Sequence, residues 1–467
     1  MASTGASNGT VPPTSLTRLA ARRIQSIAEG QISPTLRQKV VVCLIDYIAA
    51  AHSGLSTPWG EALIKYATAQ SGSPEAQVWG TKTKVSAETA AFVNAALGHS
   101  TIRDDMHLDS CSHIGSIVLS AAIALSQRHH WSGEKLIRAI VAGYEMSALL
   151  GTAIRASGKF NPHFRPSGLV GAFGAAAAAI AGGSCSEEIA VSALGFALNA
   201  ACGVNEWAWA GGLEIFTQMG TASRAGIQAF DLAKTGMFCS DTVLEGKDGL
   251  FEALGVGSSD ASVTFKDWIS RSEIGQGIMD VHFKPVAGCN FAQTPLAAAL
   301  RLRLDDPQSV QMITIVATSQ AIKYPGCNNA GQLENIQQSK MSIQYGVSAA
   351  LVYGRLDEEV FTKVDDPRIM DLMSKCELLT NEQFNIDFQR GLQPAKVEVR
   401  LADGRLVEQH LPDVPWLTFE EVESRFPFEV AKFMSKEKAA EMIASLKLLG
   451  NSGQVADASE LFAAAAI

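Results

Sequence analysis

The sequence lacks the patterns by which zinc-binding and disulfide-stabilised proteins are recognised. Its eight cysteines stand singly along 467 residues, and none forms a CxxC pair or a Cys/His cluster with the spacing of zinc ligands. Scattered single cysteines in a chain of this length are typical of reduced thiols in a reducing compartment. The sequence therefore predicts an intracellular protein, in the cytoplasm or, as an alternative left open, in mitochondria.

Basic stripes, long apolar runs and nucleotide motifs are also missing. The formal net charge is -9, and only 18% of the residues are charged, so binding to nucleic acid is not expected. No apolar run reaches the roughly 18 residues of a membrane span without a charge or a glycine cluster. The nearest candidate, residues 171–183, is rich in alanine and predicts a tightly packed buried helix. No Walker loop or dinucleotide fingerprint is present.

The first half of the chain carries small and apolar residues in helical patterns. Ser33 followed by Pro34 is a helix start, because serine caps a helix and proline suits its first position. The polar stretch before it, residues 1–13, lacks the pattern of a secretory signal and is expected to be disordered. Helices are predicted at about residues 34–54, 86–98, 115–128, 132–151, 167–181 and 186–203.

The pattern changes near Asp280. Residues 310–319 are rich in β-branched side chains and predict a strand, and residues 395–405 alternate before an Asp-Gly turn, as one half of a hairpin does. Helices are predicted between these strands and again in the last fifty residues. The fold class is therefore mainly α: a large helical domain over residues 14–270 and 418–467, with an inserted, smaller α+β lid domain over residues 271–417.

The densest polar cluster is HSTIRDDMHLDSCSHIGS, residues 99–116, between two apolar helices. Histidines beside carboxylates are suited to proton transfer near neutral pH. Three interpretations stay open: a catalytic loop, a solvated loop with helix-capping aspartates, and a metal site. The DxxH and HxxxxxH spacings match no recognised metal signature, so no metal is predicted.

A second cluster precedes a helix made of small residues. His163 and Arg165 lie in a proline-rich loop just before Ser167, where a guanidinium beside a helix N-terminus would hold a carboxylate. The alternative is a capping loop whose basic residues face water. Lys284 and Tyr324 are weaker candidates, because such residues in loops are most often at the surface.

Together these segments resemble the MmgE/PrpD family of dehydratases, decarboxylases and epimerases of small polycarboxylic acids. The resemblance implies a homodimer, an active site in the cleft between a helical domain and an α+β lid, and neither a metal nor an organic cofactor. It extends from about residue 15 to residue 450. It rests on the ordered blocks VVCLIDYIAAAHSG, SAETAAFVNAALGHS, DDMHLDSCSHIGS, GYEMSALLG, FRPSGLVGAFGAAAAAIAGG, FKPVAGCNFAQTP and SIQYGVSAALVYGRL.

The chain departs from the family pattern at several proton-handling positions. Ile102 stands where the decarboxylase branch has an aspartate, and Met106 where a threonine is usual. Arg165 replaces the histidine of a Phe-His-Pro block, and the expected lysine falls near Ile215. The loop histidine is kept as His113.

We therefore predict a cofactor-free lyase, dehydratase-like or decarboxylase-like. His113, oriented by Asp104 or Asp105, is predicted to move a proton at a carbon next to a carbonyl or carboxylate. His163 or Tyr324 would handle the partner proton.

The predicted partner is a small molecule that bears a carboxylate, bound by a homodimer with no role for membrane or nucleic acid. The side chains predicted to hold its anionic groups are Arg165, Arg103, His107 and Lys284.

Two alternatives remain. The first is an isomerase, epimerase or cyclase acting on a larger apolar substrate, which Trp207 and Trp209 favour if they line the site rather than the core. The second is a degenerate homologue that serves as a binding or regulatory subunit, which the missing lysine and histidine favour.

Overall fold

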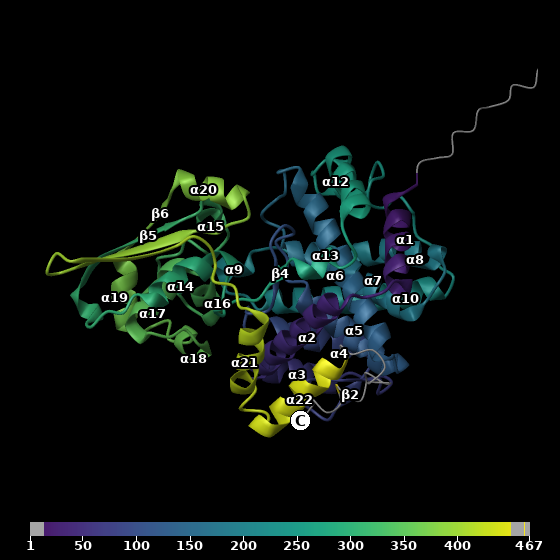
Figure 1. Cartoon of the computed structure of the whole chain (residues 1–467), viewed down its shortest axis with the longest axis horizontal. Helices are drawn as coiled ribbons and strands as arrows, with labels where there is room; N and C mark the ends of the chain where they lie inside the picture. The colour runs from purple at the N-terminus through teal and green to yellow at the C-terminus, as the bar shows by residue number, and fades with distance from the viewer. Residues whose placement is uncertain (1–13, 450–461, 463–467) are drawn as a thin grey trace, which may run out of the picture.

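The chain forms two bodies side by side, one made of helices and one built around a small sheet (Figure 1). This computed structural model describes residues 14–449 and 462. The helices of the first body, in chain order, are α1 (Leu16–Glu29), α2 (Pro34–Leu55), α3 (Gly60–Thr68), α4 (Ala87–His99), α5 (Gly115–His129), α6 (Gly133–Ala156), α7 (Pro166–Gly183), α8 (Glu187–Ala197), α9 (Trp207–Ala210), α10 (Glu214–Lys234), α11 (Leu250–Ala253), α12 (Ser258–Arg271) and α13 (Gln276–Met279).

These helices begin where the sequence supplies local caps. The side chain of Ser33 accepts a hydrogen bond from the Leu36 amide at the start of α2, and Ser86 caps α4 through the Thr89 amide. Ser132 caps α6 in the same way. The predicted helices of the first half are therefore confirmed within a few residues at most ends, because their start signals are local.

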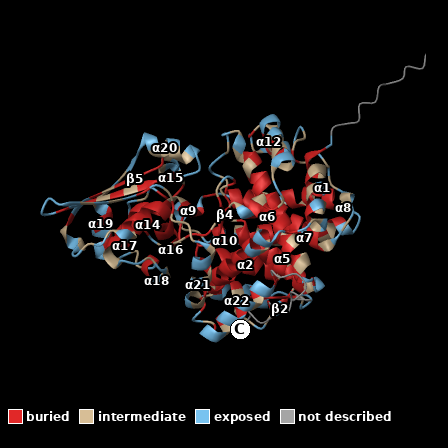
Figure 2. Cartoon of the chain, in the orientation of Figure 1, coloured by how far each residue is buried: buried red, intermediate tan, exposed pale blue. Residues whose placement is uncertain are grey.

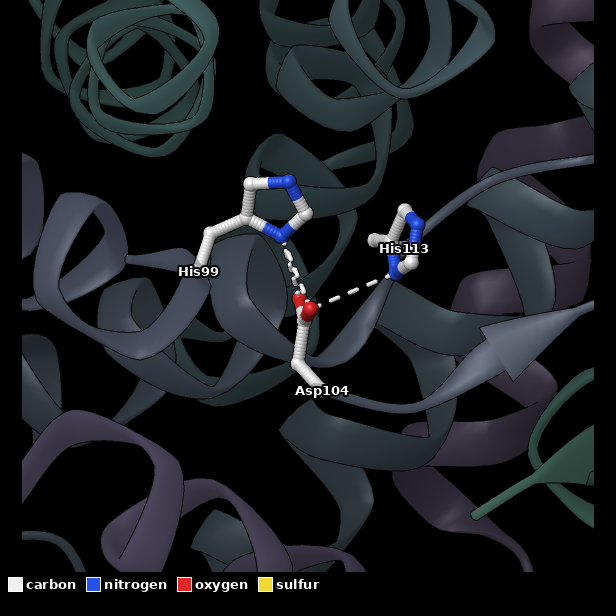
Figure 3. A group of neighbouring side chains, drawn as sticks. All are labelled: His99, Asp104 and His113. Atoms are coloured by element: carbon white, nitrogen blue, oxygen red, sulfur yellow. Dashed lines mark hydrogen bonds and ion pairs between the residues drawn. The ribbon is translucent and has the colours of Figure 1, made fainter. Parts of the chain in front are cut away.

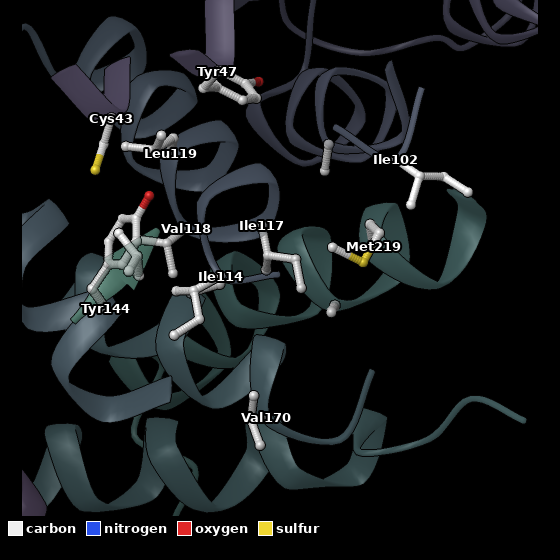
Figure 4. Close-up of a cluster of buried hydrophobic side chains, with 14 of the residues drawn as sticks. Cys43, Tyr47, Ile102, Ile114, Ile117, Val118, Leu119, Tyr144, Val170 and Met219 are labelled. Carbon is white, nitrogen blue, oxygen red and sulfur yellow. The ribbon is translucent and has the colours of Figure 1, made fainter. Parts of the chain in front are cut away.

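Small residues allow the central helices to pack closely. A Cβ atom added to Gly174 of α7 would collide with the Ser147 Oγ of α6. It would also lie 2.7 Å from the Gly143 carbonyl oxygen, which belongs to α6 as well. Both helices are long and apolar enough to cross a membrane, but 89% (α6) and 94% (α7) of their most apolar windows are buried inside the protein. Their apolar composition is thus accounted for by the core (Figures 2 and 4).

The second body contains a four-stranded sheet in the order β6-β5-β7-β8. Strand β5 runs parallel to β6 and antiparallel to β7, and β7 and β8 form the predicted hairpin. Strand β6 was not predicted, because this edge strand has few buried residues to give an alternating pattern. The elements are α14 (Gln293–Arg301), β5 (Val310–Ala317), α15 (Ser319–Lys323), α16 (Ile336–Met341), α17 (Ile343–Tyr353), α18 (Glu358–Phe361), α19 (Pro367–Ser374), β6 (Cys376–Thr380), α20 (Glu382–Gln389), β7 (Ala395–Leu401) and β8 (Leu406–Leu411).

After the sheet, the chain returns to the helical body. Helices α21 (Phe419–Glu429) and α22 (Lys436–Leu449) pack against α2, as the yellow segments of Figure 1 show. The two bodies are also joined by a short antiparallel pairing of β3 (Met106–His107) with β4 (Val281–His282). A further pair, β1 (Ala76–Gln77) and β2 (Lys84–Val85), lies at the edge of the helical body. The predicted mainly-α class is confirmed; the exact division at residues 270 and 417 stays a prediction.

The contact between α6 and α7 predicts that Gly174→Ala destabilises the fold. The added methyl group meets a backbone carbonyl that cannot move alone, so we expect a loss of about 1–3 kcal/mol in the free energy of unfolding. Urea unfolding measures it. Gly331→Ala is the matched control, because its Cβ would have only the Asn329 side chain nearby, at 3.4 Å. Equal stability of the two variants would contradict the proposed tight contact.

Candidate functional site

A buried carboxylate, Asp104, lies at the centre of the candidate site. It accepts hydrogen bonds from His99 Nδ1 at 2.8 and 2.9 Å and from Ser116 Oγ at 2.6 Å. His113 Nδ1 lies 3.3 Å from its Oδ1 (Figure 3). Burial favours the neutral acid, but His99 and His113 outweigh it and hold the pKa of Asp104 well below its usual value. The carboxylate is therefore ionised inside the protein.

His99, at the end of α4, links this carboxylate to Arg165. Its Nε2 lies within hydrogen-bond distance of a terminal nitrogen of Arg165, and a guanidinium can only donate. His99 therefore accepts at Nε2 and carries its proton on Nδ1, facing Asp104. Burial, reinforced by the charge of Arg165, lowers the pKa of His99 to about 3, so the ring is neutral.

Arg165 precedes α7 and is buried at the edge of a cavity. One terminal nitrogen donates to the Ile215 carbonyl at 2.5 Å, and the guanidinium carbon lies 5.4 Å from the centre of the Trp207 ring. Burial lowers the pKa of Arg165 to about 10, so it remains a cation at neutral pH. The predicted guanidinium beside a helix N-terminus is thus present in the structure.

His113 presents a free ring nitrogen to the same cavity. Its Nδ1 donates to the Asp105 carbonyl at 3.0 Å, and its backbone amide donates to Ser167 Oγ at 3.0 Å. Among the described residues, its Nε2 has no hydrogen-bond partner. Burial and the charge of Lys284 lower the pKa of His113, so the ring is neutral near pH 7 and Nε2 carries a lone pair.

The cavity lies between the two bodies and is small. Its volume is about 30 Å³, room for roughly one or two water molecules. The helical body contributes His113, Arg165 and Trp207, and the second body contributes Phe291 and Tyr324. Aliphatic and thioether side chains supply most of the remaining lining, so one strong cation faces an otherwise mainly apolar space.

Tyr324 supplies a phenol to this cavity from the second body. Its ring packs against Phe291, with the ring centres 5.0 Å apart. Burial raises the pKa of Tyr324 well above its usual value, so the hydroxyl keeps its proton at neutral pH. The structure therefore brings together three of the predicted residues, His113, Arg165 and Tyr324.

Two predicted anion-binding residues are not in the cavity. Arg103 donates to the Asp46 side chain at 3.2 Å and to Glu429 at 2.5 Å, so it ties α2 to α21. His107 is buried, and its Nδ1 accepts a hydrogen bond from the Ser110 amide at 3.2 Å. Neither residue lines the cavity, and His107 Nε2 and Arg103 Nε have no hydrogen-bond partner among the described residues. That both residues hold the substrate stays a prediction.

His163 and Lys284 also lie outside the cavity lining. His163 is exposed, because the turn that buries Arg165 directs the preceding loop to the surface. Lys284 is fully buried behind the cavity and donates to the carbonyls of Ile102 and Gly288 at 2.9 and 3.1 Å. Burial lowers the pKa of Lys284 to about 8. Its influence on the cavity is through its charge, which acts on His113.

Asp105 directs its side chain away from the cavity. The carboxyl accepts from the Gly115 amide at 2.9 Å and from the Tyr144 hydroxyl at 2.6 Å. Burial raises the pKa of Asp105 to about 7. The Asp105 carboxyl lies in the core beside Tyr144, and Figure 4 shows the Tyr144 side chain facing Cys43. Asp105 therefore orients His113 through its backbone carbonyl, and not through its carboxylate.

The cavity loop contains two residues in an unfavourable backbone conformation. Ile102 has φ of 55° and Cys111 has φ of 52°, and both line the cavity. The left-handed region costs a β-branched residue on the order of 1–3 kcal/mol. This conformation points the Ile102 carbonyl at Lys284, so the surrounding contacts hold the loop in its strained form.

The donor atoms of His99, Asp104 and His113 lie within 4.8 Å of one another, close enough to be tested as a metal site. Each facing atom already has a hydrogen-bond partner, and both imidazole Nδ1 atoms carry protons that a cation would have to displace. The cationic Arg165 adjoins His99. The donor set therefore fits a hydrogen-bonded triad better than a divalent cation.

Comparison with known proteins gives concordant matches over both bodies. The sequence signature of the MmgE/PrpD N-terminal domain matches residues 19–262, and that of the MmgE/PrpD C-terminal domain matches residues 287–441. The chain is 25% identical to a cis-aconitate decarboxylase of Aspergillus terreus over 406 residues, which cover 82% of each chain. It is 25% identical to the cis-aconitate decarboxylase of Homo sapiens over 464 residues, 93% of this chain and 92% of that relative.

The raised pKa of Asp105 predicts a pH-dependent difference in stability between the protein and its Asp105→Asn variant. The unfolded carboxyl ionises at about pH 4, whereas the folded one stays protonated to about pH 7. Between these values the native state binds more protons, so this group lowers the free energy of unfolding as pH rises, by up to roughly 1.4 kcal/mol per pH unit. The amide of the variant cannot titrate, so its stability relative to the native chain should rise from about pH 4 to about pH 7 in denaturant melts. If the free energies of unfolding of the two proteins changed in parallel with pH, the raised pKa of Asp105 would be excluded.

Proposed function

Because the chain belongs to the MmgE/PrpD family, we propose that it is a lyase that removes water or carbon dioxide from a small carboxylic acid by general acid–base catalysis. The observation that carries this proposal is the meeting of His113, Arg165 and Tyr324 in one cavity between the two bodies. The named relatives are decarboxylases, which supports the reaction class. Identity of 25% leaves the particular acid open, so the proposal extends to the class of reaction only.

Binding of the acid is assigned to Arg165 and the N-terminus of α7. Ser167 follows Arg165 in the first turn of the 18-residue helix α7, and both residues line the cavity. A guanidinium and the positive end of a helix dipole favour the same anion. A substrate carboxylate placed there would lie on the same side as His99 and Asp104, which keep Arg165 oriented by an unbroken chain of hydrogen bonds.

The proton chemistry is assigned to His113 and Tyr324. The lone pair on His113 Nε2 takes a proton from a carbon next to a carboxylate, and the imidazolium formed keeps its Nδ1–H facing the Asp105 carbonyl and Asp104. In dehydration, Tyr324 donates its proton to the departing hydroxyl as the carbon–oxygen bond breaks and a double bond forms. Each acid or base step of this kind contributes about 10²- to 10⁴-fold.

Decarboxylation would use the same groups in a different order. The carbon–carbon bond breaks, carbon dioxide leaves, the electron pair of the bond stays on the substrate, and Tyr324 delivers its proton to that carbon. No step needs an electron acceptor, and the hydrogen-bonded triad of His99, Asp104 and His113 is complete without a metal. This is the basis for proposing a reaction without a cofactor.

An isomerase acting on a larger, less charged acid is the second candidate. Trp207 is buried and lines the cavity, whereas Trp209 is 49% exposed, so only the first of the two tryptophans supports an apolar ligand. Proton removal by His113 and return to a neighbouring carbon would give an isomer with no loss of mass. Product analysis by mass spectrometry separates this outcome from loss of water or of carbon dioxide.

Replacement of His113 tests the proposal directly. His113→Asn removes the base and keeps a hydrogen-bond donor near the Asp105 carbonyl, so turnover of an accepted acid should fall by at least about 10²-fold. The control is His163→Asn, an exposed histidine outside the cavity, which should retain native turnover. The assay follows substrate and product by NMR. Equal activity of both variants would remove His113 from the mechanism, and binding without conversion by the native chain would support a regulatory subunit.

The charge of Lys284 is expected to set the pH at which kcat/KM falls on the acidic side of its pH profile. His113 must be neutral to act as a base, so kcat/KM should fall as pH drops through its pKa, which lies below the usual 6.5. Lys284→Met removes the positive charge that lowers this pKa, so the limb should move to higher pH. A purely structural role of Lys284 would lower the rate at every pH and leave the limb in place.

A further inference from the structure

A second, larger compartment adjoins the cavity. Its volume is about 300 Å³, and it shares with the inner cavity the side chains of Met106, Cys111, Asn290 and Phe291. Its remaining walls come from the loop that follows β3, from the end of α6 and from the segment around the end of α20. Because the inner cavity has only about 30 Å³, an acid that occupies it and has further atoms would extend past these four side chains into the outer compartment.

The outer compartment has apolar walls suited to a carbon chain. Leu108, Ala156 and Phe388 join Met106 and Phe291 in its lining. Burial of a carbon chain against these side chains removes its methylene groups from water, which favours binding more as the chain lengthens. The walls come from both bodies, so a chain bound here would contact the helical body and the second body at once.

Two of the side chains that line this compartment carry buried polar atoms without partners. Asn290 is 7% exposed, and its amide nitrogen is held by Gln393 at 3.1 Å, while its Oδ1 is buried and has no hydrogen-bond partner among the described residues. The Thr152 Oγ1 is buried and, in the part of the chain that the structure describes, unpaired as well. Leaving a buried polar atom unpaired destabilises a protein, so both atoms indicate a place for a polar group of a ligand.

Arg155 provides the outer compartment with a cation that the inner cavity does not share. It lies one turn after Thr152 on α6, and its Nε donates to the Asp109 carbonyl at 2.9 Å. Within residues 14–449 and 462, its two terminal nitrogens have no hydrogen-bond partner. The Asp109 carboxylate lines the compartment too but forms no ion pair with Arg155 in the described residues, so the guanidinium is available to an acceptor.

We propose that the outer compartment binds an extension of the substrate. The acid would place its reacting carboxylate at Arg165, run several carbons past Phe291 and Phe388, and end in a carboxylate or carbonyl oxygen held by Arg155. This inference rests on the proposed function only for the position of the reacting end. It selects elongated acids with a second acceptor over compact polycarboxylates, which would leave the outer compartment and its unpaired polar atoms unused.

The test uses 3-hydroxy α,ω-dicarboxylic acids of four to ten carbons and the full-length protein. Binding is measured by calorimetry, and loss of water or carbon dioxide by NMR. Affinity should rise with chain length until the far carboxylate reaches Arg155. Arg155→Gln should weaken binding of the longer diacids about tenfold and leave the four-carbon acid and methyl-ended acids of equal length unchanged. Lys159→Gln, an exposed cation on the loop after α6, is the matched control.

A second variant fills the compartment without touching the inner cavity. Ala156→Trp, at the exposed end of α6, should abolish the gain in affinity with chain length and preserve binding of the four-carbon acid. Affinity independent of length, or equal effects of Arg155→Gln and Lys159→Gln, would overturn the proposal.

The proposed chemistry is tested apart from the compartment. If long diacids bind in an Arg155-dependent manner but none is converted, the compartment stands and the lyase function fails. If the four-carbon acid is converted with no advantage for longer ones, the function stands and the compartment proposal is overturned.

Discussion

The ionised carboxylate of Asp104 is the constraint on which the site depends. An unpaired charge in the interior is very costly, so the fold must surround it with donors. His99 comes from the end of α4, Ser116 from the first turn of α5, and His113 from the loop between them. His99 donates from Nδ1 to Asp104, and His113 donates from Nδ1 to the Asp105 carbonyl beside it, so the Nε2 atoms of both rings are left as acceptors. One acceptor orients Arg165, and the other, on His113, is open to the cavity.

The site divides its chemical groups between the two bodies. The base and the cation come from the helical body, whereas the phenol of Tyr324 and the aromatic ring of Phe291 come from the second body. Their relative position therefore depends on the contacts that join the bodies. These contacts include β3 with β4 and the bond from Lys284 to the Ile102 carbonyl. The cluster of Arg103, Asp46 and Glu429 fixes the helix that follows the sheet.

Sequence patterns predicted the helices and strands that have local signals and the cavity residues that lie in polar loops. His113 and Arg165 were found because each breaks an apolar pattern beside a helix start. The role of Arg103 could not be foreseen, because its partner Glu429 is 326 residues away in the chain. The exposure of His163 could not be predicted, because a loop pattern does not determine which of two nearby basic residues turns inward.

His99 is a residue of the site that the sequence patterns did not identify. It is the first residue of the polar segment 99–116 and the last residue of a buried helix. Its role became apparent only in the structure, where one ring nitrogen lies beside Asp104 and the other beside Arg165. A signal did exist, in the five-residue spacing to Asp104. The direction of the Ile102 backbone could not have been inferred, because a β-branched residue rarely adopts a positive φ.

The size of the inner cavity has a consequence for how tightly any ligand can be held. A space of about 30 Å³ holds only one end of an acid of four carbons, so the rest of such a ligand would lie in the adjoining compartment of about 300 Å³. If the two bodies separate to admit a ligand, the apparent dissociation constant equals the intrinsic one divided by the fraction of molecules that are open. Each contact that holds the two bodies together, such as the bond from Lys284 to the Ile102 carbonyl, would then weaken capture while it strengthens enclosure of what has been captured.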